Sequence, residues 1–338
     1  MAVDPQVYSF SDWQLGVKTS ITTIGLAAAN PVVNLQLVDI DGPATFTPGT
    51  FMRTEIRSGT PGQIAGDADV LVCDKGVLNE VSFSSIYDTT SGVILMPNLF
   101  GVTIGSSPAG YAYTYDWTSP TMAHGQATPT ADEVMDLCLI HPEPAKSISL
   151  IGGCLTTATI SGDVEEDNGQ IKMSATYTTG YKPVYDQTSP TTPTAYGSTK
   201  RYLSQADTTH TVAGCSNVII KSFSLTINNP VTYKGSNSVV EGDPEIIVRG
   251  IPEVEILLDT TIKVDANTAS LYAAMATNSA VATEISDNAT WASAANFGFK
   301  GSKGRILRIA ENDVGAGYYD VSQKFFADTS GEAAELII

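Results

Sequence analysis

Alternation of apolar and polar residues is the dominant pattern of the chain, and it is typical of strands with one buried and one solvated face. Residues 219–227 follow it closely, and residues 254–264 follow it over a length that is unusual for a small domain. Two further alternating runs between residues 155 and 178 flank Asn168 and Gly169. Asn-Gly is a strong hairpin signal because both turn positions require positive φ. The pattern therefore predicts long antiparallel strands.

Shorter runs predict further strands, which brings the total to about a dozen. A helix is predicted after Asp265, a good N-cap, where Leu271 and Met275 lie one turn apart in an Ala-rich run that ends near Asn278. A second short helix is predicted near residues 322–326. The predicted class is all-β and mainly antiparallel, a β-sandwich or barrel with one or two short flanking helices. The shorter strand candidates are residues 34–40, 51–57, 69–73, 80–86, 111–115, 134–141, 245–249 and 305–309.

A segment rich in Pro, Thr and Ser, from Thr178 to Gly197, interrupts the regular pattern and indicates a long loop or linker. It divides the chain into halves that each contain strands, a break and more strands. Residues 64–70 and 248–254 are loosely alike, which is a weak sign of a duplicated unit. The predicted division is an N-terminal β-rich unit with an N-terminal arm at 1–180, a linker at 181–215, and a C-terminal β-rich unit with the flanking helix at 216–338.

Composition fits a folded protein, since 42% of the 338 residues are apolar and only 16% are charged. No stretch approaches the roughly 18 apolar residues of a membrane helix, and the first residues lack the features of a signal peptide. We therefore expect a soluble protein without contact to membranes.

The charge is strongly acidic, with 36 acidic against 18 basic residues and a formal net charge of -18. Such a surface repels phosphate and argues against tight, non-specific binding of nucleic acid. The charge is also uneven along the chain, which indicates either solvated faces with a charged strand edge, or complementary faces that meet in an assembly. Residues 76–145 contain no Lys or Arg but seven acids, namely Glu80, Asp88, Asp116, Asp132, Glu133, Asp136 and Glu143, whereas the basic residues Lys300, Lys303, Arg305 and Arg308 cluster near the C-terminus.

No set of residues predicts catalysis, a cofactor or a metal. Asp136, Cys138 and His141 could be imagined as ligands, but on a strand His141 faces the side opposite to the other two. Residues 163–169 resemble the start of a calcium loop, yet the glycine is one position late and Ser174 stands where a closing Glu is required, so a hairpin turn with solvated acids is expected. The four cysteines are Cys73, Cys138, Cys154 and Cys215, and their apolar surroundings and wide spacing predict buried free thiols.

The Thr-, Ser- and Gly-rich alternating strands resemble those of the major tail tube proteins of tailed bacteriophages, of the siphovirus type. The resemblance rests on residues 218–229, on 245–250 followed by 254–264 and an Ala-rich helix, and on the hairpin that runs from Ile151 to Gly180. It covers residues 50–310 as a style of sequence, and its motifs are not specific.

The resemblance implies a structural, non-enzymatic protein of the virion tail, made in the host cytoplasm. It implies that copies of the chain form rings that stack into a tube, and that the tape measure protein and DNA pass through without specific binding. Tail terminator or distal tail proteins are the further partners that it implies. Rings of the family are sixfold, or threefold when one chain carries two tube units, and the two halves of this chain favour the pseudo-sixfold trimer over the hexamer.

Two other functions compete with this one. A viral or cell-surface β-sandwich that binds glycans would need an exposed aromatic platform, and Tyr111, Tyr113, Tyr115 and Trp117 are the candidates. A packed core or a subunit contact explains these residues equally well. A hydrolase built on carboxylates has no positive feature.

Three expectations follow for the structure. Residues 254–264 should form a central strand, paired on both sides, whose even positions, Ile256 among them, face the core. In a tube, the acidic residues of 76–145 should line part of the inner wall. The basic cluster at 300–308 should lie at contacts between subunits or rings.

Overall fold

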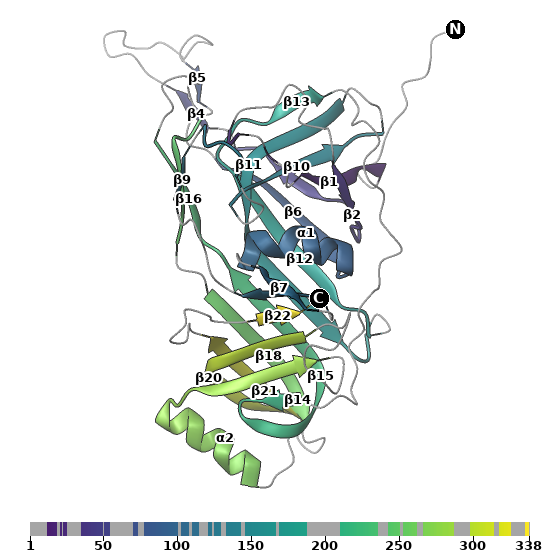
Figure 1. Ribbon diagram of the computed structural model, residues 1–338, viewed down its shortest axis with the longest axis vertical. Helices are drawn as coiled ribbons and strands as arrows, with labels where there is room; N and C mark the ends of the chain where they lie inside the picture. Colours follow the sequence, from purple (N-terminus) through teal and green to yellow (C-terminus); the bar gives the residue numbers. More distant parts are fainter. Residues whose placement is uncertain are drawn as a thin grey trace, which may run out of the picture.

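A computed structural model shows an elongated molecule built almost entirely of antiparallel strands, with two α-helices in its described part (Figure 1). The predicted all-β fold with short flanking helices is confirmed. The structure describes residues 12–18, 21, 23–25, 35–49, 51–54, 70–73, 78–100, 103–107, 110–114, 121–123, 125–129, 133–142, 146–166, 169–187, 210–235, 243–250, 253–261, 266–286, 298–313, 318–325 and 335–337.

An eight-stranded antiparallel sheet extends through the whole molecule and defines its architecture. Its two middle strands, β11 and β15, come from the two halves of the chain and pair from Thr157–Asn228 to Asp163–Ser222. In spatial order, the strands are β3 (Thr45–Thr47), β6 (Asn79–Ile86), β12 (Lys172–Thr179), β11 (Ser147–Asp163), β15 (Cys215–Asn228), β18 (Glu253–Thr261), β21 (Tyr318–Phe325) and β20 (Gly298–Asp313).

A second layer of strands packs on one face of this sheet in each half. The long strands β11 and β20 take part in both layers, because their first residues pair in the second layer and their last residues in the eight-stranded sheet. The other strands of the second layer are β1 (Gln14–Lys18), β2 (Gln36–Val38), β10 (Met135–Ile140) and β13 (Val184–Gln187) in the first half, and β14 (His210–Val212) and β19 (Val281–Ser286) in the second.

The remaining elements extend or cover this framework. Helix α1 (Thr89–Phe100) lies across the middle of the molecule, and α2 (Ala266–Thr277) lies at its lower end in the view of Figure 1. The smaller strands are β7 (Thr103–Ser107) and β8 (Gly110–Thr114), which join β20 through β22 (Glu335–Ile337); β9 (Thr121–Ala123), β17 (Ile246–Arg249) and β16 (Val231–Lys234), which form a three-stranded sheet; and β4 (Phe51–Thr54) with β5 (Val70–Cys73), which form a hairpin.

The same order of elements and pairings occurs twice along the chain. β1, β2 with β3, β6, α1, β10, β11 and β12 of the first half correspond to β14, β15, β18, α2, β19, β20 and β21 of the second. The lengths also agree, with 12 residues in each helix, 17 in β11 against 16 in β20, and 8 in both β12 and β21. We call residues 14–179 the N-terminal repeat and residues 210–325 the C-terminal repeat.

Glycines allow each long strand to bend from one layer into the other. Gly152 has a φ of 59°, and a Cβ on the adjacent Gly153 would lie 2.2 Å from the Tyr177 ring. In the C-terminal repeat, a Cβ on Gly304 would lie 2.8 Å from the ring of Phe325. A side chain at either bend would therefore displace an aromatic ring of the next strand.

One hydrophobic core fills the space between the layers and runs through both repeats. In the eight-stranded sheet, alternate residues such as Phe83, Ile160 and Leu225 point into it. The helices differ in their packing: α1 buries Leu95, Met96 and Leu99, whereas Leu271 is the one residue of α2 that the described side chains show as buried.

Most predicted strands are present. Strand β18 is paired on both sides, as expected, with Val254 buried and Glu255 exposed; the side chain of Ile256 and residues 262–265 lie outside the described part. The predicted hairpin is β11–β12, although a long connection replaces the tight turn, and Asn168 lies outside the described residues.

Two helix predictions differ from the structure. Residues 322–326 do not begin a helix, because β21 continues to Phe325 and pairs with both β18 and β20. Helix α1 was not predicted, since it contains Pro97, a glycine and β-branched residues, which disfavour a helix in isolation. Within the predicted linker at 181–215, β13 pairs with β11 and β14 pairs with β15, and residues 188–209 lie outside the described part.

Candidate functional site

The face of the eight-stranded sheet that points away from the core is lined with hydroxyl groups. The cross-strand register places Ser84, Ser174, Thr159 and Thr226 in one row across four strands, and Ser161 and Ser224 side by side in the next. Ser82 Oγ lies 3.2 Å from Thr176 Oγ1, and Thr159 Oγ1 lies 3.4 Å from Thr226 Oγ1, so hydroxyls of adjacent strands hydrogen-bond to each other. One hollow in this surface is lined in part by Ser82, Ser84, Thr159, Ser174 and Thr176, and a second combines Ser161, Ser222 and Ser224 with charged residues such as Asp163 and Lys172. We call this surface the hydroxyl face.

Charged residues on the hydroxyl face form local pairs of opposite sign. Lys172 Nζ lies 3.1 Å from a carboxylate oxygen of Asp41. Farther along the sheet, Lys324 Nζ lies 2.6 Å from Glu253, and Ser322 Oγ donates to Glu255 at 3.0 Å. These pairs are partly exposed, so each contributes about 0.2–1 kcal/mol at most. Their main effect is to offset the positive charge of the two lysines.

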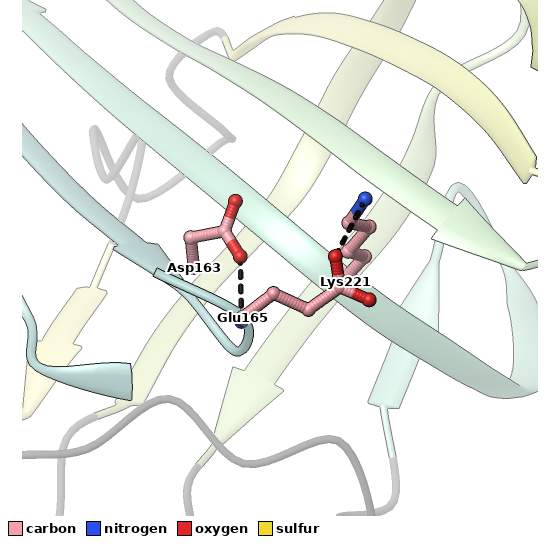
Figure 2. Close-up of polar contacts among 3 residues, drawn as sticks. All are labelled: Asp163, Glu165 and Lys221. Atoms are coloured by element: carbon pink, nitrogen blue, oxygen red, sulfur yellow. Dashed lines mark hydrogen bonds and ion pairs between the residues drawn. The ribbon is translucent and has the colours of Figure 1, made fainter. Parts of the chain in front are cut away.

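The acidic turn after β11 is held by its own contacts (Figure 2). Asp163 Oδ1 accepts a hydrogen bond from the backbone N–H of Glu165 at 2.8 Å, and Glu165 pairs with Lys221 of β15 at 3.0 Å. Two carboxylates of the supposed calcium loop are thus used in a turn and an ion pair. Among the residues whose placement is described, no three His, Cys, Asp or Glu side chains come close enough to share a metal ion.

The two outermost strands of the eight-stranded sheet each leave one edge open within the described part of the chain. β3 pairs with β6 on one side, and beyond Gly304 β20 pairs with β21 on one side. Unpaired backbone groups on an open edge can pair with another chain. In the middle of the sheet, the equivalent strands β15 and β11 already pair with each other.

β16 and β17, which we call the strap, extend from the C-terminal repeat over the N-terminal repeat (Figure 1), where β17 pairs with β9. Arg249 at the end of the strap is buried, and its guanidinium donates to the carbonyl oxygens of Asn98 and Glu133. Its Nη2 also lies 3.5 Å from Cys154 Sγ. The strap therefore joins the two repeats through buried polar contacts.

The imagined ligand set at residues 136–141 serves structural purposes instead. Asp136 accepts a hydrogen bond from the N–H of Gly152 at 2.8 Å, and burial raises the pKa of its carboxyl to about 6. Burial also raises the pKa of the Cys138 thiol to about 11, which keeps the thiol protonated and inert. The His141 ring packs edge-on against Trp13 at 4.7 Å. Cys138, Cys154 and Cys215 are buried and free, as predicted, and Cys73 lies in β5.

The acids of residues 76–145 do not form one surface. Asp88, Glu133 and Asp136 are buried, so they belong neither to a solvated acidic face nor to an inner wall, whereas Glu80 is exposed on β6. Sequence reasoning could not separate them because a buried carboxylate needs partners from distant segments. Asp116, Asp132 and Glu143 lie outside the described residues.

The predicted basic cluster lies on β20. Lys303 and Arg308 are exposed, and Lys300 and Arg305 are half-buried. Arg305 and Arg308 pair with Lys324 and Ser322, which places both on the hydroxyl face at the outermost strand. Of the proposed aromatic platform, Tyr111 and Tyr113 lie on β8, whereas Tyr115 and Trp117 lie outside the described residues.

A comparison with protein families matches residues 23–314 to the phage tail tube protein family. The chain belongs to this family. The match includes both repeats except for their outermost strands, β1 at the start of the first and β21 at the end of the second. A comparison with curated proteins found no match. Membership makes this tail tube family protein a structural component of a phage tail, with a non-enzymatic role. Within the described residues, no helix is long and apolar enough to span a membrane.

Proposed function

We propose that three copies of this tail tube protein close into a ring, that the rings stack into a tube, and that the hydroxyl face lines the channel through which DNA passes. The observation that carries the proposal is the eight-stranded sheet with two open edges. Its central junction, β11 with β15, supplies a pattern for joining one copy to the next. The C-terminal repeat would meet the N-terminal repeat of the next copy just as the two repeats meet within one chain.

Each edge strand corresponds to one of the two strands that pair at the central junction. β20 corresponds to β11, and β3 corresponds to the second half of β15. Pairing of β20 beyond Arg308 with Thr45–Thr47 of the next copy would therefore reproduce the junction inside the chain. A head-to-tail contact of this kind closes into a ring and removes the open edges.

The width of the resulting channel supports three copies. Three sheets of eight strands give 24 strands, which at about 4.8 Å spacing and about 40° tilt enclose a backbone diameter of about 48 Å. Side chains reaching inward by about 5 Å on each side leave about 38 Å, against about 20 Å for duplex DNA. Two copies would leave about 22 Å, which gives the duplex no room for its water and ions. Each ring would thus contain six tube repeats from three chains.

The chemistry of the hydroxyl face suits a channel that DNA must leave. Binding of phosphate by Lys or Arg releases counterions and adds affinity with each contact. Ser and Thr hydroxyls offer no such gain, because they hydrogen-bond equally well to water and to each other. Lys172 and Lys324 on this face are already paired with acids, and Arg305 and Arg308 lie on its outermost strand, where the next copy would join. Phosphates would therefore slide past the wall with little affinity for it.

The location and partners of the tube follow from this role. The assembled protein would lie in the virion tail after synthesis in the host cytoplasm, with the tape measure protein inside the tube. Tail terminator and distal tail proteins would bind the exposed faces of its two end rings. The proposed division at residues 1–180, 181–215 and 216–338 corresponds to the two repeats and their connection, except that β14 and the first residue of β15 fall within 181–215. The repeated order of elements supports it.

Mass and image measurements on the concentrated protein test the proposal. Size-exclusion chromatography with light scattering should give a species of three chains that grows into tubes, and negative-stain images should show rings with a central channel. A protein that stays monomeric at every concentration and ionic strength, and in the presence of the tail's own initiating proteins, would overturn the proposal.

A further inference from the structure

We infer that the β4–β5 hairpin of one copy docks on the C-terminal repeat of the neighbouring copy in the ring, as the strap docks on the N-terminal repeat within one chain. The inference rests on the proposed ring and goes beyond it, because it names a second contact, separate from the pairing of sheet edges. It also gives a function to a hairpin that pairs with no other strand in the described part of the chain.

The docking of the strap on the N-terminal repeat serves as the pattern for this contact, and its hydrogen bonds are well defined. Where β15 ends, the backbone N–H of Asn229 donates to the carbonyl of Thr156 in β11 at 2.7 Å. The Asn229 side chain donates to the carbonyl of Leu155 at 2.9 Å. Within the strap, the Tyr233 hydroxyl donates to the carbonyl of Thr178 at 2.7 Å, and Arg249 reaches the end of α1. The strap thus covers the bend of β11 and the C-terminal end of α1.

The β4–β5 hairpin occupies the same place in the N-terminal repeat as the strap does in the C-terminal repeat. The hairpin connects β3 with β6, and the strap connects β15 with β18, which are the corresponding strands. Each consists of two antiparallel strands of four residues. If successive repeats meet in the same way around a ring, the hairpin reaches the C-terminal repeat of the next copy.

Within the described residues, the surface that the hairpin would cover is open. The bend of each long strand is followed by a bulge, at Thr156 in β11 and at Leu307 in β20, and Leu307 is 53% exposed. The tenth residue of α1 is Asn98, which is buried against the strap, whereas the tenth residue of α2 is Met275, which is 38% exposed. Helix α2 carries no charged residue, although most of its described side chains are exposed. An exposed helix without charges indicates a surface that a protein partner covers.

Arginine and cysteine occupy exchanged positions in the two repeats, and this exchange supports docking of the β4–β5 hairpin on the C-terminal repeat. Cys154 follows the bend glycine of β11 and meets Arg249, the last residue of the strap. In the C-terminal repeat, the residue after the bend glycine is Arg305, whose guanidinium donates to the carbonyl of Asn278 at the end of α2. The last residue of β5 is Cys73. The arginine that reaches the helix end thus comes from the strap in one contact and from β20 in the other. The cysteine comes from β11 in the first contact and would come from β5 in the second.

Cysteine crosslinking of assembled protein tests the inference directly. The Arg305→Cys chain, which keeps its native Cys73, is assembled and treated with a short crosslinker that joins two thiols. Cys138, Cys154 and Cys215 are buried and should not react. Denaturing electrophoresis should show linked dimers and trimers. The linked species should disappear when Cys73 is replaced by Ser in the same chain, and Leu257→Cys, at an exposed position on the hydroxyl face, should give none.

The outcomes separate this inference from the proposed function. Rings or tubes that form normally but yield no link between residues 73 and 305 would overturn the hairpin contact and leave the ring intact. Absence of any assembly by the wild-type chain would overturn both the ring and the hairpin contact. Linked dimers and trimers that need Cys73 would support the contact.

A pair of leucine variants provides a second measurement. Leu307 and Leu257 are similarly exposed, at 53% and 47%, so neither replacement by Asp should prevent folding. Leu307→Asp should raise the protein concentration at half-assembly about tenfold or more, because a leucine that becomes buried contributes over 1.4 kcal/mol. Leu257→Asp should leave this concentration within about threefold of the wild type. Equal effects of the two variants would contradict the contact.

Discussion

Replacement of Gly153 by Ala tests how each long strand passes from one layer to the other. A Cβ at this position would lie 2.2 Å from Cζ of Tyr177 and 2.6 Å from the carbonyl oxygen of Thr178. Tyr177 is fully buried, and its hydroxyl donates toward the carbonyls of Met135 and Leu150 at 3.0 and 3.1 Å. The ring cannot move without losing these partners.

The expected cost combines two effects. Overpacking of a tight core costs about 1–3 kcal/mol. Loss of the tyrosine hydrogen bond to buried carbonyls adds about 1–3 kcal/mol. Together they remove about 2–6 kcal/mol from a typical unfolding free energy of about 5–15 kcal/mol. Gly304→Ala, at the corresponding bend beside Phe325, should be destabilising for the same reason.

Urea unfolding of the unassembled chain, followed by far-ultraviolet circular dichroism, measures the cost. The control is the same substitution in a Tyr177→Leu background, where the ring is absent and at least half of the cost should disappear. A Gly153→Ala protein within 0.5 kcal/mol of the wild type would refute the reasoning, and so would an equal cost in both backgrounds.

Four further variants test other features of the protein. Burial raises the pKa of Asp136 above its ordinary 3.8, to about 6, so the carboxyl's contribution to stability falls as pH rises through this window. In urea titrations, the unfolding free energy of Asp136→Asn should therefore gain up to about 3 kcal/mol relative to the wild type between pH 4 and pH 7. A difference that stays constant with pH would contradict this. Arg249→Ala should lose about 2–5 kcal/mol in the same assay because two buried carbonyls lose their donor, and an unchanged midpoint would refute the buried strap contact. Ile256→Asp should prevent folding, since its position in the central strand β18 predicts a buried carboxylate, and soluble, assembling protein would show that the register is wrong. Thr159→Lys combined with Thr226→Lys should leave assembly intact but slow DNA ejection from phage particles in a way that salt relieves, whereas ejection at the wild-type rate would exclude these residues from the channel wall.

Local alternation predicted the strands of the central sheet because each of them has one face in the core and one in water. It also predicted the three buried thiols, since free cysteines in apolar runs behave as small hydrophobic residues. Helix α1 escaped prediction because tertiary packing of Leu95 and Leu99 outweighs the unfavourable Pro97 in its sequence. The short helix predicted at 322–326 failed because a five-residue pattern cannot distinguish a helix from the end of a strand.

The candidate site was only partly readable from the sequence. The sequence shows Ser and Thr at alternate positions. That they form one hydroxyl face depends on the register of strands from both halves of the chain. The burial of Asp136 and Glu133 could not be foreseen, because their hydrogen-bond partners lie in other segments. Arg249 appears in the sequence as an ordinary strand-end residue, and only its contact with α1 shows its role in joining the repeats.

The central claim is that three copies close one continuous sheet around a channel lined by the hydroxyl face. A cryo-electron microscopy map of the assembled tube tests it most directly. The account predicts three chains per ring, each β20 paired with β3 of the next copy, and Thr159, Ser174 and Thr226 facing the channel. Six chains per ring, or a channel lined by any other surface while the hydroxyl face points outward, would contradict it.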